Sequence, residues 1–198
     1  MTQIKGDKDI KGAPTNTKTI YYVSTSIDGF IAEPDDALDW LYEIDPGDRD
    51  ISRFASGVGV VAMGAATYES VLRDSGLLEH PERWQQEHRD RPVWVFTHRE
   101  LPKVAGADIN FVSGDVRPVH QEMVSAARGK NILIAGGGAL ATAFADAGLL
   151  DQMFIGVAPV MLAIGKPVFT GRLTSAQLKL SKVEQAGQLA YLTYDVKA

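Results

Sequence analysis

Three consecutive glycines, Gly136 to Gly138, are the residues of this chain best suited to hold an anion. They follow the apolar run Ile132-Leu133-Ile134-Ala135, and a helix-like segment over residues 139–147 comes directly after them. Glycine has no Cβ, so backbone N–H groups can approach a ligand closely, and the next helix start adds a partial positive charge. This arrangement favours a phosphate or pyrophosphate. A plain tight turn is the alternative, because the spacing is not that of the G-x-G-x-x-G motif.

Composition excludes several classes of protein. The 198 residues carry a net charge of −5, and with no cluster of Lys or Arg this disfavours nucleic acid as a partner. The chain has no cysteine, which excludes disulfides, thiolate metal sites and cysteine nucleophiles. The four histidines show no ligand spacing, so we assign no metal. No run of about eighteen apolar residues is present, and we expect a cytoplasmic protein without a membrane span.

The elements that must position the glycines alternate between strand and helix. Apolar and β-branched runs predict strands over 19–24, 58–63, 92–97, 109–112, 132–135 and 152–157. Helices are expected over residues 50–55, 65–73, 116–128 and 139–147. We also expect a short helical piece after Pro34 and a polar loop over residues 79–91. Residues 177–184 and 189–196 are typical of two antiparallel strands.

This order predicts one α/β domain over residues 19–198. We expect a mostly parallel central sheet with helices on both faces and an antiparallel C-terminal hairpin. Residues 1–18 contain four lysines and little apolar surface to bury, which predicts a disordered leader or tag remnant.

Four stretches, taken in order, resemble the dihydrofolate reductase-like superfamily. Residues 26–32 (Ser-Ile-Asp-Gly-Phe-Ile-Ala) resemble its first loop, residues 60–70 its second strand, glycine turn and helix start, residues 91–99 its third strand with the adenosine-phosphate contact, and residues 135–138 its pyrophosphate turn. Residues 149–152 and 158–169 resemble the branch that includes the reductase domain of riboflavin biosynthesis. The Met-Gly and Thr-Tyr-Glu pieces of residues 63–69 are closer to true dihydrofolate reductases. The chain is therefore similar to a stand-alone member of this group, with that superfamily's fold.

The resemblance implies an oxidoreductase that uses NADPH. The nicotinamide is expected near Ser24 and Ala32, with the loop between them as a lid, and the diphosphate between two helix starts. Arg99, after the third strand, suits the adenosine 2′-phosphate because its paired N–H donors match a phosphate. Ala65 stands where dihydrofolate reductases often carry an arginine, so one phosphate contact is missing. The cofactor-binding positions implied in this way are Ser24, Ala32, Gly64, Ala65, Ala66, Thr67, Thr97, His98, Arg99, Gly136, Gly137, Gly138, Ala139 and Leu140.

The resemblance also implies hydride transfer to a small heterocycle. The substrate would be 5-amino-6-(5-phosphoribosylamino)uracil, as in riboflavin biosynthesis, or a dihydrofolate. Reduction of a C=N bond requires a proton at nitrogen, and the two branches place the acid at Asp28 (riboflavin) or at Asp50, four residues before Phe54 (folate). A turn role for Asp28 and a helix-capping role for Asp50 are the alternatives.

Three aromatic residues, Tyr22, Trp40 and Phe54, are expected to wall the substrate pocket, with core packing as the alternative. A homodimer formed through the C-terminal strands and residues 158–169 is plausible by resemblance. A different class of protein also stays open, a nucleotide-binding relative without turnover. A Rossmann dehydrogenase is disfavoured, because no G-x-G-x-x-G turn lies near the first strand.

Overall fold

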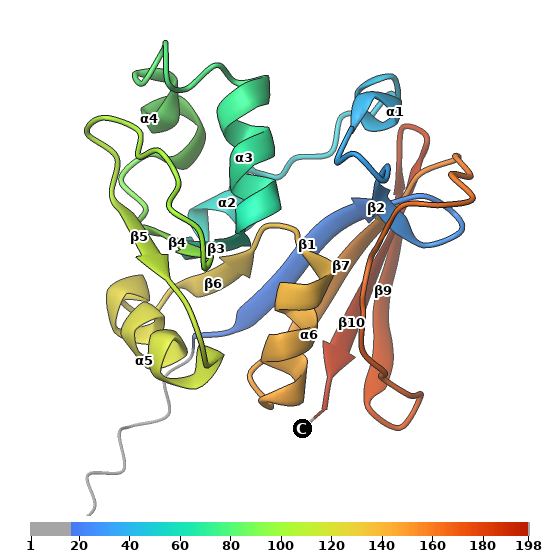
Figure 1. Ribbon diagram of the computed structural model, residues 1–198. Helices are drawn as coiled ribbons and strands as arrows, with labels where there is room; N and C mark the ends of the chain where they lie inside the picture. Colours follow the sequence, from blue (N-terminus) through green and yellow to red (C-terminus); the bar gives the residue numbers. More distant parts are fainter. Residues whose placement is uncertain (1–16, 198) are drawn as a thin grey trace, which may run out of the picture.

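An eight-stranded sheet in the order β5-β4-β3-β6-β1-β7-β10-β9 organises the molecule (Figure 1). The computed structural model describes residues 17–197. All strands from β5 to β7 in this order run parallel, whereas β10 is antiparallel to both β7 and β9. These strands are β1 (Thr19–Thr25), β3 (Val58–Gly64), β4 (Val93–Phe96), β5 (Ile109–Val112), β6 (Asn131–Ile134), β7 (Gln152–Val157), β9 (Leu178–Ala186) and β10 (Leu189–Val196). The predicted parallel sheet with its antiparallel C-terminal hairpin is confirmed, while the leader predicted for residues 1–18 falls almost wholly outside the described residues.

Helices cover both faces of the sheet, and the alternation of residues along β3 shows why. Val60 and Ala62 join the core on the side of α5 (Val116–Ala127) and α6 (Gly138–Asp146). Val61 and Met63 join the core on the side of α3 (Ala65–Asp74) and α4 (Arg83–His88). Successive side chains of a strand point to opposite faces, so a strand that is apolar throughout is buried on both sides.

The two helices that begin at glycines lie on opposite faces of the sheet and start from neighbouring strands. Strand β3 leads into α3, and its neighbour β6 leads into α6 (Figure 1). The winding of the chain therefore reverses between adjacent parallel strands, which opens a crevice at their carboxyl ends. Ligands of open α/β sheets bind in such a crevice.

A second, two-stranded sheet, which was not predicted, covers the carboxyl end of β1. It pairs β2 (Phe30–Ala32) with β8 (Lys166–Pro167) in antiparallel fashion. Further backbone bonds from Ile27 N–H to Val160 O (2.8 Å) and from Val168 N–H to Gly29 O (2.8 Å) tie the same two segments together. Strands this short contain no periodic pattern that a sequence can reveal.

Two local predictions were wrong. The polar loop predicted over 79–91 contains α4, whose Trp84 is buried against Tyr68, with ring centroids 6.4 Å apart. The two short helices before β3 are α1 (Asp39–Tyr42) and α2 (Ser52–Ser56); the helix predicted over 50–55 is thus present, but its start was placed two residues too early. Among residues 17–197, no helix combines the length and apolar character needed to cross a membrane.

Candidate active site

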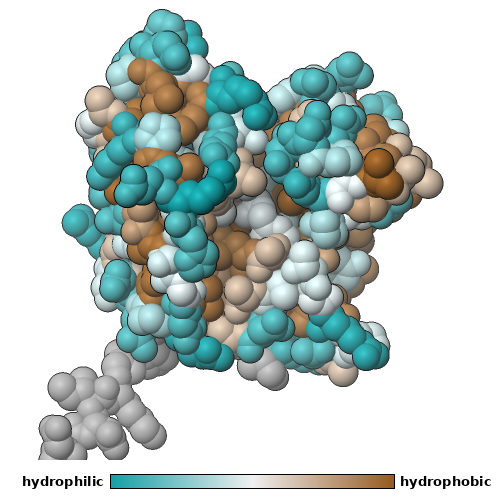
Figure 2. Space-filling view, in the orientation of Figure 1, coloured by the Kyte–Doolittle hydropathy of each residue, from teal (hydrophilic) through white to brown (hydrophobic). Residues whose placement is uncertain are grey.

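A cleft of about 660 Å³ opens where β1, β3 and β6 end. Figure 2 shows this face hollowed between the lobe that carries α3 and α4 and the lobe that carries α1 and β2. The predicted site residues that line the cleft are Tyr22, Ser24, Ala32, Ala66, Thr67, Gly136, Gly137, Gly138 and Ala139. Residues more than a hundred positions apart in the sequence thus share one cavity.

The glycine turn and the start of α3 lie against each other in the wall of this cleft. Gly136 and Gly137 have φ angles of +90° and +85°, which L residues with a side chain rarely adopt. A Cβ at Gly137 would lie 3.9 Å from the amide N of Gly64 and 4.0 Å from Oγ1 of Thr67. A Cβ at Gly64 would meet nothing within 4 Å. Two helix starts therefore meet here, with open space at Gly64, and their backbone forms a cradle that suits a diphosphate.

The third glycine also serves the packing of the fold. A Cβ at Gly138 would collide with the carbonyl O of Pro167 and lie 2.9 Å from the carbonyl C of Val168. The first turn of α6 thus packs directly against the segment that follows β8. Close packing thus accounts for Gly138, whereas Gly136 and Gly137 remain the predicted anion-binding turn.

Asp28 lies outside the cleft and holds a loop in place. Its carboxylate accepts hydrogen bonds from Ser26 Oγ (2.6 Å), Leu162 N (3.1 Å) and Ala163 N (2.7 Å). The hydrogen bond from Ser26, followed by those from the backbone, holds the pKa of Asp28 below its ordinary value. An ionised carboxylate with these partners has no proton to give at neutral pH, so the geometry favours the turn role over the acid role.

Asp50 is exposed and lines a separate depression with Arg49 and Lys182. Its Oδ1 accepts the backbone N–H of Ser52 (2.8 Å). Hydrogen bonding from the Ser52 side chain, followed by that from its backbone N–H, lowers the pKa of Asp50. Because that carboxylate bonds a backbone N–H two residues on, α2 begins at Ser52 and Asp50 does not share a helical face with Phe54. The prediction of a shared face was wrong, and Asp50 stands at the helix start, close to the capping alternative.

The aromatic residues separate into one cleft residue and its supports. Tyr22 lines the cleft, and its ring centroid lies 5.2 Å from that of Phe54, which itself does not line it. Arg49 Nη1 donates to the Tyr22 hydroxyl (3.1 Å), and the Arg49 guanidinium lies 4.1 Å from the centroid of the Tyr191 ring. Burial raises the pKa of Tyr22 more than Arg49 lowers it, so the phenol is protonated at neutral pH. Arg49 was not predicted as a site residue, because an arginine between two aspartates in a polar stretch is typical of an exposed surface segment.

Trp40 does not line the cleft. It is buried in a small core with Ala158, Leu189 and Tyr191. Core packing, the alternative for this residue, therefore describes Trp40 better than a pocket wall.

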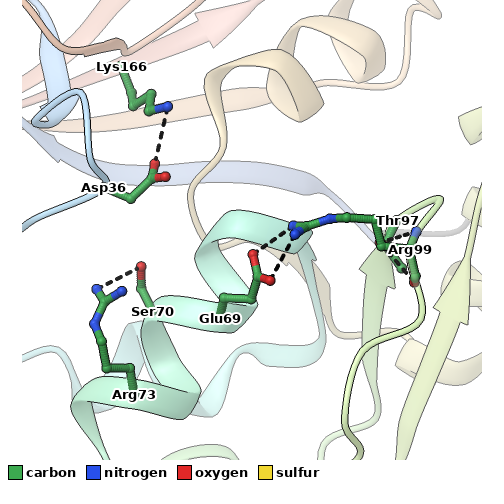
Figure 3. A network of polar contacts seen from close by, with 7 residues as sticks. All are labelled: Asp36, Glu69, Ser70, Arg73, Thr97, Arg99 and Lys166. Carbon is green, nitrogen blue, oxygen red and sulfur yellow. Dashed lines mark hydrogen bonds and ion pairs between the residues drawn. The ribbon is translucent and has the colours of Figure 1, made fainter.

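The end of the cleft away from the glycine turn is acidic. Asp74 of α3 and Glu87 of α4 line it, with Asp74 accepting from the Tyr42 hydroxyl (3.2 Å) and Glu87 from the Ser75 hydroxyl (2.6 Å). Asp36 and Lys166 also line the cleft, and Lys166 Nζ lies 3.7 Å from Asp36 Oδ1 (Figure 3). Sequence analysis missed all of these groups, because they meet only once α1, α3, α4 and β8 are packed together. Carboxylates here can accept hydrogen bonds from amino groups of a ligand.

The loop after β4 lies beyond the cleft lining. Arg99 extends from it toward α3 and forms two hydrogen bonds with Glu69, Nη1 to Oε1 at 2.9 Å and Nη2 to Oε2 at 2.6 Å (Figure 3). Thr97 Oγ1 accepts the backbone N–H of Arg99 (2.9 Å), which fixes the base of that side chain. The remaining predicted cofactor positions, Gly64, Ala65, His98 and Leu140, also do not line the cleft, although Gly64 directly precedes α3.

Comparison with known proteins places this architecture in a family. Residues 17–192 match the family model described as the RibD C-terminal domain. The chain belongs to this family. It is 31% identical over 178 residues to the uncharacterized protein YwjB of Bacillus subtilis (strain 168), a match that covers 89% of this chain and 97% of YwjB.

Solved structures give the same result for the fold. A candidate riboflavin biosynthesis protein from Shewanella sp. PV-4 is 28% identical, with a TM-score of 0.72 over 92% of this chain and 100% of that chain. Dihydrofolate reductase from Enterococcus faecalis, solved with NADP(H) and RAB-propyl, is 14% identical, with a TM-score of 0.55 over 93% of this chain and 98% of that chain. The second likeness concerns the fold alone. The family match thus confirms the predicted resemblance to the reductase domain of riboflavin biosynthesis, and the structural likeness confirms the predicted dihydrofolate reductase-like fold.

Proposed function

We propose that this member of the RibD C-terminal domain family is a reductase that transfers hydride from NADPH to a small nitrogen heterocycle. The observation that carries the proposal is the cradle between the start of α3 at Gly64 and the glycine turn at Gly137, at the switch point of the sheet. NADPH, when bound, supplies the hydride. The chain's own residues then have to hold the diphosphate, shield the reacting ring and provide a proton.

The backbone performs the first two tasks. Amides of the turn at Gly136 and Gly137 and of the first turn of α3 hold the anionic diphosphate, aided by the partial positive charge of two helix starts. Ser24 and Ala32, both in the cleft wall, flank the nicotinamide. The small sheet of β2 and β8 lies over the end of β1 and limits access of water to this region.

Tyr22 is our proposed source of the proton. Its hydroxyl oxygen accepts a hydrogen bond from Arg49, a bond that does not use the hydroxyl's own hydrogen, and we propose that this hydrogen passes to a substrate nitrogen in the cleft. Arg49 also stabilises the phenolate left after the transfer, since a guanidinium remains charged at any working pH. Neither Asp28 nor Asp50 lines the cleft.

The substrate is proposed to be an aminopyrimidine of the riboflavin type. Asp74 and Glu87 offer acceptors for ring and exocyclic N–H groups, and Lys166 is a cation in the cleft wall that can bind an acidic group of the substrate. A dihydrofolate is the second candidate, since its pterin ring has similar donors and since residues 63–69 resemble true dihydrofolate reductases.

A nucleotide-binding protein without turnover is a third candidate, favoured by the position of both predicted acids outside the cleft. The test is oxidation of NADPH, followed by absorbance, with each proposed substrate added in turn to purified protein. Oxidation that depends on the pyrimidine supports the proposal, and oxidation with dihydrofolate alone supports the second candidate. If the protein binds NADPH but oxidises it with neither substrate, the third candidate, a nucleotide-binding protein without turnover, is supported.

A further inference from the structure

The pairing of Arg99 with Glu69 has a consequence for cofactor selection. Both terminal nitrogens of the guanidinium face the two carboxylate oxygens, at 2.9 and 2.6 Å (Figure 3). This is the bidentate geometry in which arginine also binds phosphate. The fork of donors that a phosphate would use is therefore already occupied by a side chain of the same protein.

The pair does not line the cleft, but it lies beside residues of α3 that do. Ala66 lines the cleft, and Glu69 follows it by three residues in α3, so both side chains share one face of that helix. Strands β3 and β4 are parallel neighbours, with Gly64 in register with Phe96. The loop that carries Arg99 therefore leaves the sheet beside the start of α3, next to the cradle proposed for the diphosphate.

This ion pair can open at modest cost. The side chains of Arg99 and Glu69 are 58% and 40% exposed, and exposed ion pairs contribute little to stability because water competes for both partners. A phosphate on a bound ligand can thus replace the Glu69 carboxylate. While Glu69 remains nearby, its charge repels that phosphate.

We propose that Glu69 is a specificity-determining residue that competes with the adenosine 2′-phosphate of NADPH for Arg99. NADH lacks this phosphate, so it binds without displacing Glu69. The preference of this protein for NADPH over NADH is consequently weaker than it would be if Arg99 were not paired with Glu69. This inference rests on the proposed function, since it concerns the outer end of the same nucleotide site.

The test compares NADPH and NADH affinities, measured by nicotinamide fluorescence, for the wild type, Glu69→Gln, Arg99→Ala and the double variant. We expect Glu69→Gln to strengthen NADPH binding about two- to fivefold, the range that an exposed ion pair allows, and to leave NADH binding nearly unchanged. Arg99→Ala should weaken NADPH far more than NADH, and the gain from Glu69→Gln should shrink in that background. Glu122→Gln, at an exposed position of α5, is the matched control for the loss of one negative charge.

The outcomes separate this inference from the proposed function. Weaker NADPH binding by Glu69→Gln would mean that Glu69 orients Arg99, and an unchanged ratio of NADPH to NADH affinity would mean that the pair lies outside the site. Either result overturns the inference while nucleotide binding by the wild type stands. A wild type that binds neither nucleotide would overturn the proposed function and this inference together. Because Glu69→Gln is an isosteric change at a partly exposed position, equal melting temperatures should confirm that the variants are folded.

Discussion

Replacement of Gly137 by alanine separates the conformational role of the glycine turn from its role as a cradle. The φ angle of +85° at Gly137 costs an L residue about 1–2 kcal/mol of folding free energy. The added Cβ would meet no close contact within the protein, since its nearest neighbour is Leu140 Cβ at 3.7 Å. It would, however, project between Gly64 and Thr67, into the space proposed for the diphosphate.

The matched control for this variant is Gly114→Ala. Gly114 has a similar φ angle of +91°, and a Cβ there would meet nothing within 4 Å. We expect both variants to lose similar stability in thermal melts. Only Gly137→Ala should weaken NADPH binding, by about tenfold or more, because a methyl group that blocks an amide removes a charge-assisted hydrogen bond worth roughly 1.5–3 kcal/mol. Equal NADPH affinities in the two variants would refute the cradle.

Four further changes test the remaining residues. Tyr22→Phe should reduce turnover about a hundredfold or more with little change in NADPH affinity, since it removes the proposed acid; a variant with normal turnover would exclude Tyr22 as the donor. Asp28→Asn should lower the melting temperature and expose residues 158–165 to protease, because the amide replaces an acceptor of three hydrogen bonds; lost turnover in a fully stable variant would restore the acid role. Asp50→Asn should leave both turnover and NADPH affinity unchanged, and a large loss of turnover would contradict its placement outside the cleft. Burial lowers the pKa of His88 below its ordinary value, so the folded protein favours the neutral imidazole. The folding free energy contributed in this way is fully present above the pKa of His88 in the unfolded chain. It should be lost as the pH falls from there through the pKa of His88 in the folded protein. Melting curves between about pH 7 and 5 should show a smaller decline for His88→Gln than for the wild type, and an equal decline would contradict this role of His88.

The sheet was predictable because its strands are continuous apolar runs. The strand predicted over 152–157 is β7 with the same bounds, and the other parallel strands agree within about two residues, the usual uncertainty of element ends. Helix α4 was missed because Trp84 is its only buried residue, and one apolar position among charged neighbours does not establish a helical period. The sheet of β2 and β8 depends on contacts between segments more than 130 residues apart.

The candidate site was predictable where the backbone forms it and unpredictable where side chains do. Glycines that precede a helix indicate an anion site by their chemistry alone, which is why the turn at Gly136 and Gly137 was found. The role of a carboxylate depends on which groups donate to it. The donors to Asp28 include Leu162 and Ala163, 134 and 135 residues away. In the same way, no spacing in the sequence indicates that Glu69 meets Arg99.

The central claim, that a dinucleotide binds between the start of α3 and the glycine turn, is tested most directly by amide hydrogen exchange with and without NADPH. Amides that donate to a bound diphosphate exchange more slowly, so the footprint shows both binding and its place. The account predicts slower exchange at residues 64–67 and 136–140 when NADPH is present. Unchanged exchange in both segments, or protection confined to another part of the chain, would contradict it.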